Sequence, residues 1–152
     1  MGLEHIDKLV KTISDLAKGY KVIFLQTMHH RIDMDNFDGW HLRTAKAFKR
    51  YAGFESVLIN PGDVSIPILK VIQGFPVIFV PYKDLNSIPL HRWGHVSPSW
   101  GKLVAKILNS LYSISDKVFT LIHAPRAFNS LIAFLGAREA GVPIVLQHHG
   151  EK

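Results

Sequence analysis

The sequence contains no cysteine, which excludes disulfide bonds, thiolate metal ligands and cysteine nucleophiles. It also lacks any apolar run approaching the roughly 20 residues that a bilayer-spanning helix needs. The first ten residues, MGLEHIDKLV, include acidic side chains, and no small-residue cleavage site follows an apolar core, so we expect no signal peptide. Together these absences predict a cytoplasmic protein that is soluble by itself.

The composition fits a single globular domain. The chain has 152 residues, of which 47% are hydrophobic, enough to build one core. Its net charge of +6 favours an anionic partner such as a nucleotide, a phospholipid surface or a nucleic acid. The basic residues are dispersed, and no surface that interleaves basic with aromatic residues is visible, so nucleic acid is not an expected partner.

One apolar run, Lys21–His30 (KVIFLQTMHH), ends directly in two histidines. Its residues Val22, Ile23 and Phe24 are β-branched or aromatic, which is typical of a strand buried on both faces. We therefore predict a central strand of a parallel sheet. Ligands of open α/β sheets bind beyond the carboxyl ends of the strands at the topological switch point, so the histidines after this strand are candidate site residues.

Helical and extended patterns alternate along the chain, which predicts a doubly wound, mostly parallel α/β sheet with helices on both faces. We expect helices at Leu3–Lys18, Gly39–Ala52, Lys102–Tyr112 and Phe128–Ala140, and strands at Lys21–Gln26, Phe54–Ile59, Phe75–Val80, Val118–Ile122 and Pro143–Leu146. Asp38 is a candidate N-cap, and Asn60–Gly62 is expected to be a turn. A short strand or a helix precedes Phe75, and Tyr82–Ser99 is expected to be a long connection without regular structure, of a kind that is often functional.

Histidines follow the carboxyl ends of several predicted strands. In a parallel sheet these ends share one edge, so residues distant in sequence converge on one crevice. The histidines concerned are His29, His30, His123, His148 and His149. A single strand-end histidine is more often a polar residue satisfied by backbone or water, so the prediction of a site depends on the gathering of several.

Three chemistries could use such a cluster. General acid or base catalysis needs only one well-placed imidazole. Phosphate or sugar binding needs donors and helix N-termini, which the Asp38–Gly39 turn and the helix after Pro125 could supply. Metal binding could add Asp33, Asp35 or Glu151, but the spacing matches no metal signature, and adjacent histidines of an extended chain point apart. We therefore expect no metal.

The C-terminal part of the sequence resembles a known family. The segment GVPIVLQHHGE (Gly141–Glu151) resembles the close of the N-terminal domain of GT-B glycosyltransferases of family 4, where a strand after a Gly-Val-Pro turn ends in a His-Gly pair. Asp116–Pro143 is similar to the same family's strand, His-Ala turn and Ala-rich helix. Lys21–Gln26 and Asp38–Ile59 resemble its first strand, Gly-rich turn, long helix and second strand. Between Asn60 and Trp100 the resemblance is weak.

The resemblance implies retaining transfer of a sugar from a nucleotide diphosphate sugar to a sugar or lipid acceptor, in a cleft between two Rossmann-like domains. Residues 1–152 would form the N-terminal, acceptor-side domain, and the nucleotide-sugar domain would lie outside this chain, which would be inactive alone. His149 matches the family's active-site histidine, and Gly150 would keep the backbone close to the sugar. Gly39 matches one glycine of the turn that faces the diphosphate, whereas Asp38 stands where a second glycine is usual. No cofactor is implied.

The helix expected over Gly39–Ala52 separates basic from apolar residues at 100° per residue. The basic face comprises Arg43, Lys46, Lys49 and Arg50, and the apolar side Trp40, Ala45, Phe48 and Tyr51. A basic helix face is more often a solvated surface. Its functional interpretation is attraction to an anionic membrane that holds a lipid acceptor, at about 1 kcal/mol per basic residue. The inner membrane surface is therefore a candidate location.

Two hypotheses of other classes remain open. The first is a stand-alone flavodoxin-like module that uses the histidine-rich edge to bind a small anion or a regulatory partner. The second is a hydrolase with a histidine-ligated metal. A second α/β domain downstream in the reading frame would favour the glycosyltransferase, and metal analysis of the purified protein would test the hydrolase.

Overall fold

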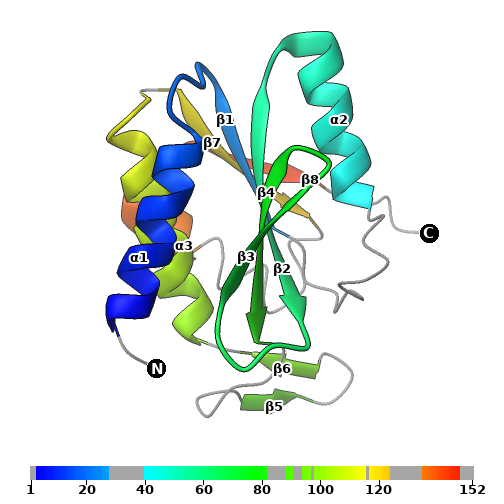
Figure 1. Cartoon of the computed structure of the whole chain (residues 1–152). Coiled ribbons are helices and arrows are strands. Elements are labelled where there is room, and N and C mark those ends of the chain that lie inside the picture. The colour runs from blue at the N-terminus through cyan, green and yellow to red at the C-terminus, as the bar shows by residue number, and fades with distance from the viewer. Residues whose placement is uncertain are drawn as a thin grey trace, which may run out of the picture.

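The computed structural model describes residues 3–27, 40–81, 88–90, 94–96, 98–115, 117–123 and 135–147. The helices are α1 (Leu3–Leu16), α2 (Trp40–Ala52) and α3 (Pro98–Tyr112), and the strands are β1 (Ile23–Thr27), β2 (Glu55–Gly62), β3 (Ile68–Ile72), β4 (Phe75–Pro81), β5 (Ile88–Leu90), β6 (Gly94–Val96), β7 (Val118–His123) and β8 (Ile144–Gln147). Six of these strands form one sheet, and β5 pairs with β6. Helices α1 and α3 cover one face of the large sheet and α2 lies on the other (Figure 1).

The large sheet has the strand order β3-β4-β2-β1-β7-β8. All neighbouring pairs are parallel except β3 with β4. Numbered along the chain, the parallel strands β1, β2, β4, β7 and β8 are therefore arranged 3-2-1-4-5, which is a Rossmann-like order, whereas flavodoxin-like sheets are ordered 2-1-3-4-5. The α/β fold class predicted from the alternating pattern is confirmed, and the topological switch point lies between β1 and β7.

Successive residues of β1 enter different cores, because side chains of a strand alternate between its two faces. Ile23 and Leu25 are fully buried in the core beneath α1 and α3. Phe24 points to the other face, where its ring centroid lies 5.0 Å from that of Phe48 on α2 and 5.3 Å from that of Phe119 on β7. Burial on both faces explains why the residues Val22–Leu25 form a continuous apolar run.

Helix α2 ends where the sequence predicts. Gly53 follows its last residue with a φ of 67°, a left-handed conformation that glycine adopts without a Cβ penalty. The amide of Phe54 then donates to the carbonyl of Phe48 at 3.2 Å, and the amide of Gly53 to that of Lys49 at 3.2 Å, which closes the helix as in a Schellman motif. The expected helix over Gly39–Ala52 thus agrees with α2 at its C-terminal end.

The turn expected at Asn60–Gly62 is wrong. These residues extend β2, in register with Phe79, Val80 and Pro81 of β4. Strand β1 ends at Thr27 opposite Ile59, so the extension of β2 pairs with β4 alone among the strands described. A proline is tolerated where one side of a strand is unpaired, because its missing amide hydrogen breaks no ladder bond there.

The structureless connection expected at Tyr82–Ser99 is also wrong in part. It contains the antiparallel pair β5 and β6, with Ile88 opposite Val96. Helix α3 begins at Pro98 rather than at Lys102, since proline fits the first turn of a helix, where its missing amide hydrogen needs no partner. The segment expected as either strand or helix before Phe75 is the edge strand β3.

Near the C-terminus, residues 135–140 are helical and lead into β8. The remainder of the helix expected over Phe128–Ala140 lies outside the described residues. Among the helices that are described, none combines the length and the apolar character needed to cross a membrane.

Candidate functional site

The strands that precede the candidate histidines lie side by side and run in the same direction. In the paired register, Thr27 of β1 lies opposite Ile122 of β7, and His123 lies opposite Gln147 of β8. The segments that follow β1, β7 and β8 therefore leave the sheet at the same carboxyl edge, next to the switch point. This arrangement, on which the predicted convergence of histidines depends, is confirmed.

The structure places only part of the predicted site. His123 is the last residue of β7, and its backbone is at the carboxyl edge. The other candidates, His29, His30, Gly39, His148, His149 and Gly150, lie outside the described residues, as does the proposed cap Asp38. The strands are thus brought together as expected, and the meeting of the imidazoles stays a prediction.

Three buried polar side chains that the sequence reading overlooked lie on the α2 face of the same sheet. Gln26, Ser56 and Asn60 have exposed fractions of 1%, 0% and 0%. Gln26 is in register with Leu58, and Asn60 follows Leu58 by two residues, so both point to the core that Leu58 and Phe79 form with α2. Gln26 and Asn60 come from adjacent strands, and both lie near the carboxyl edge.

These side chains are incompletely hydrogen-bonded. Gln26 donates from Nε2 to Ser56 Oγ at 2.9 Å. Within the described part of the chain, Gln26 Oε1 and both amide atoms of Asn60 have no hydrogen-bond partner. A buried polar group without a partner costs about 1–3 kcal/mol, so such groups call for a reason. Carbonyl oxygens and an amide NH₂ together suit hydroxyl groups, which donate and accept at once.

The sequence did hold a signal for these residues. Gln26 is the one polar residue between Val22 and Thr27, and the candidate histidines His29 and His30 follow the same strand. Asn60 was assigned to a turn because Pro61 and Gly62 follow it, and this assignment concealed its burial. Thr120 also has an unpartnered hydroxyl among the described atoms, but it is in register with Leu25 and so faces the other core.

All four residues of the basic face predicted for α2 are exposed, and one of them, Lys49, also contacts the sheet. Arg43, Lys46 and Arg50 are exposed, and α2 contains no acidic residue. Lys49 is exposed as well, and its Nζ lies 3.6 Å from Glu55 Oε2 and 5.7 Å from the Phe75 ring centroid. We call Arg43, Lys46 and Arg50 the basic ridge.

The helical geometry explains why Lys49 lies at the border of this face, whereas Tyr51 departs from its predicted side. Lys49 follows the fully buried Leu42 by seven residues, close to two helical turns, so it borders the core. Tyr51, which was assigned to the apolar side, is 78% exposed and is therefore corrected. Its ring lies 5.3 Å from the guanidinium carbon of Arg50, beside the basic ridge.

The metal-binding alternative is not tested at the residues that it would use. No group of three or more histidine, aspartate or glutamate side chains is arranged to hold a metal ion in the part of the chain that is described. Asp33, Asp35 and Glu151 lie outside that part, together with most of the candidate histidines.

The fold and the candidate site define a Rossmann-like α/β protein with a polar carboxyl edge. Comparison with protein-family models, curated proteins and solved structures gave no match for this chain. The functional assignment therefore rests on the residues, their geometry and the resemblance described above.

Proposed function

We propose that this chain is the N-terminal, acceptor-side domain of a retaining GT-B glycosyltransferase that uses a nucleotide diphosphate sugar. The observation that carries the proposal is the 3-2-1-4-5 order of the parallel strands, with the switch point between β1 and β7. Sheets with this order bind nucleotides beyond the carboxyl ends of the strands at the switch point. Among the segments that resemble the glycosyltransferases, Lys21–Gln26 ends near that edge, one residue before the end of β1.

In the proposed reaction, the bond between the sugar C1 and the diphosphate oxygen breaks. The acceptor hydroxyl gives its proton to the departing diphosphate oxygen while its own oxygen forms a bond to C1 on the same face, and the nucleoside diphosphate leaves. His149 orients the sugar and stabilises the charge that develops on the leaving group, since preorganised hydrogen-bond donors act most strongly on developing charge. Gly39 and the start of α2 face the diphosphate, where free amides of a first helical turn favour anions.

The buried amides add neutral hydrogen-bonding capacity to the same edge. Gln26 Oε1 and the side-chain amide of Asn60 are unpartnered among the described residues. Sugar hydroxyls can satisfy acceptors and donors together. Because both side chains are buried, we assign these two residues to positioning of the segment that contacts the sugar.

The basic ridge supports a lipid-linked acceptor. Arg43, Lys46 and Arg50 project from a helix without acidic residues, and Tyr51 is exposed next to them. Basic side chains near an anionic lipid surface contribute about 1 kcal/mol each. We propose that this ridge lies against an anionic membrane when the acceptor is bound.

The strand order favours this proposal over the stand-alone flavodoxin-like module. That module would have the order 2-1-3-4-5, in which β1 is flanked by the second and third parallel strands. Here β1 is flanked by β2 and β7, which are the second and fourth parallel strands along the chain.

The test uses the protein translated from the complete reading frame. Purified protein is incubated with UDP-glucose, UDP-N-acetylglucosamine and GDP-mannose, and release of nucleoside diphosphate is measured. We expect turnover with at least one donor, and a loss of about 100-fold or more in His149→Ala, because one key polar contact to the transition state is removed.

The matched control is His5→Ala. The His5 Nε2 atom hydrogen-bonds to the Pro67 carbonyl at 2.7 Å, away from the strands of the switch point, so its loss should leave turnover unchanged. Wild-type turnover in His149→Ala would show that His149 takes no part in the mechanism. An absence of turnover with every donor would contradict the proposed function.

A further inference from the structure

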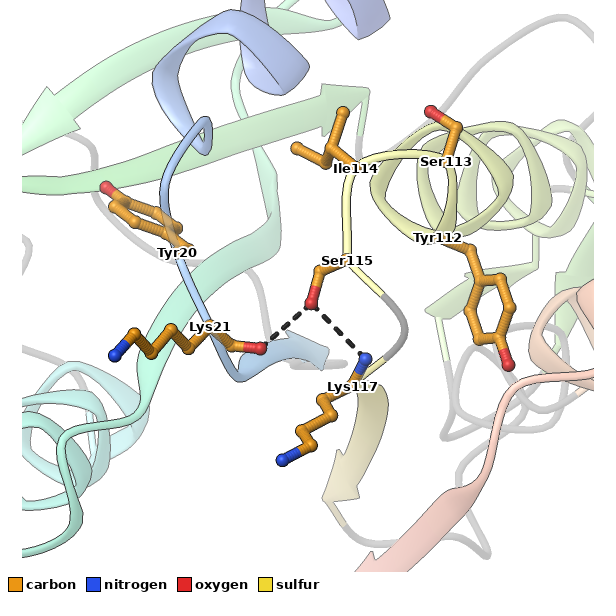
Figure 2. Close-up of a pocket in the computed structure, with 7 residues that line it drawn as sticks. All are labelled: Tyr20, Lys21, Tyr112, Ser113, Ile114, Ser115 and Lys117. Carbon is orange, nitrogen blue, oxygen red and sulfur yellow. Dashed lines mark hydrogen bonds between the residues drawn. The ribbon is translucent and has the colours of Figure 1, made fainter.

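A second polar hollow lies at the opposite, amino edge of the sheet, where the connection from α1 to β1 meets the connection from α3 to β7. Its volume is about 590 Å³, within the range of small-molecule sites. The polar residues that line it are Tyr20, Lys21, Tyr112, Ser113, Ser115 and Lys117. Figure 2 shows Tyr20 and Tyr112 on opposite flanks of Ser115.

One serine clamps the two connections together. Ser115 Oγ donates to the backbone carbonyl of Lys21 at 2.8 Å and accepts from the backbone amide of Lys117 at 3.2 Å (Figure 2). The amide of Ile23 also donates to the Lys117 carbonyl at 2.9 Å. These hydrogen bonds hold the backbones of the two lysines next to each other, just before the parallel strands β1 and β7.

The two lysine side chains have no acidic partner within the described residues. Both are exposed, and in Figure 2 they leave the serine clamp on the same side, away from Tyr112. Other lysines of the chain form ion pairs with carboxylates: Lys106 Nζ lies 3.1 Å from Asp7 Oδ1, and Lys49 pairs with Glu55. Two unpaired cations of like charge beside one hollow repel each other, and a bound anion would relieve that repulsion.

A structural role as helix caps does not account for these lysines. The hollow adjoins the C-terminus of α3, whose carbonyl groups attract positive charge. Those carbonyls already accept hydrogen bonds: Asn109 from the Ser113 amide at 3.2 Å, Ser110 from the Ser113 hydroxyl at 2.6 Å, and Leu111 from the Ser115 amide at 3.0 Å. The helix end is therefore capped without a lysine.

We propose that this hollow binds a small molecule that carries a phosphate monoester. A phosphate dianion is attracted by both ammonium groups, and serine and tyrosine hydroxyls supply neutral donors. The rings of Tyr20 and Tyr112 offer apolar surface to the remainder of the ligand. Burial, and then the negative charge of Glu55, raise the pKa of Tyr20, so its phenol stays protonated. This site lies at the other edge of the sheet and does not depend on the proposed transfer reaction.

The experiment is a titration of the full chain, labelled with ¹⁵N, at low ionic strength with inorganic phosphate, with AMP and with adenosine. We expect phosphate and AMP to shift the amide signals of Lys21, Ser115 and Lys117, and adenosine to leave them in place. In the double variant Lys21→Gln/Lys117→Gln, the affinity for AMP should fall about 10-fold or more, because two charged hydrogen-bond donors are lost.

The matched control is Lys11→Gln/Lys70→Gln, which removes the same charge from exposed positions on α1 and β3. It should bind AMP as the wild type does. Equal weakening in both double variants would show attraction to net charge alone and would overturn the proposal. Shifts caused by adenosine, or phosphate-induced shifts spread over all exposed lysines, would overturn it as well.

Discussion

At the scale of single residues, Asn60 carries a buried side-chain amide that is expected to lower the stability of the fold. Its side chain is fully buried on the α2 face of β2, and its amide atoms lack partners within the described structure. A leucine has the same branching pattern and would place no desolvated polar group there. Retaining an amide there is what we expect if a ligand or a bound segment supplies the missing hydrogen bonds.

The substitution Asn60→Leu is therefore predicted to raise the free energy of unfolding by about 1 kcal/mol, because a buried unsatisfied amide is removed. In the complete protein the same change should lower the rate of sugar transfer. Urea unfolding of the chain measures the first effect and nucleotide release the second.

The control for this prediction is Asn109→Leu, at an exposed position of α3. Surface changes of that kind usually stay within about 0.5 kcal/mol. If Asn60→Leu instead destabilises the chain, the amide has native partners and the positioning role is wrong.

Residue-level features of the site were only partly predictable. The histidines stand out in the sequence because they follow apolar runs. The burial of Gln26 and Asn60 could not be predicted, because burial of a polar side chain depends on what packs over it. Here α2 packs over the sheet, and no local sequence pattern indicates these contacts. The contacts of Lys49 with Glu55 and Phe75 could not be predicted either, because they come from other elements.

At the scale of elements, α2 combines an inward apolar side with the outward basic ridge. Leu42 and Ala45 are fully buried against the sheet. Arg43, Lys46 and Arg50 are exposed, and the helix has no acidic residue to balance them. An exposed tyrosine beside basic residues is typical of a helix that rests at a membrane interface.

We predict that the chain binds vesicles of phosphatidylcholine and phosphatidylglycerol, and that the triple variant Arg43→Gln/Lys46→Gln/Arg50→Gln loses about 100-fold in affinity. This loss follows from about 1 kcal/mol for each basic residue near an anionic surface. Sedimentation with vesicles measures it.

The control triple variant, Lys8→Gln/Lys11→Gln/Lys102→Gln, removes the same charge from exposed positions of α1 and α3 on the other face of the sheet. It should retain most of the binding. Equal losses of vesicle affinity in the two triple variants would show that the attraction depends on net charge alone. They would contradict a specific role of the basic ridge.

Element boundaries were predictable where local chemistry sets them. The end of α2 follows from Gly53, whose left-handed backbone stops the helix. The extension of β2 through Pro61 and the pair of β5 and β6 were missed, because each depends on a partner strand. Three-residue strands such as β5 are also too short to show a period.

For the whole molecule, the alternating pattern was enough to predict a mostly parallel α/β sheet. It could not give the strand order, because the pairing of β1 with both β2 and β7 joins segments that are distant in sequence. Nor could it show that β3 is antiparallel to β4. The order places the switch point between β1 and β7.

The most direct test of the central claim is to locate a bound nucleotide sugar on the ¹⁵N-labelled protein translated from the complete reading frame. With a donor that supports turnover, we expect amide shifts at Thr27, His123 and Gln147, at the carboxyl ends of β1, β7 and β8. Lys21 and Lys117, at the amino edge, should respond less. Shifts confined to the amino edge, with none at the ends of these three strands, would contradict the account.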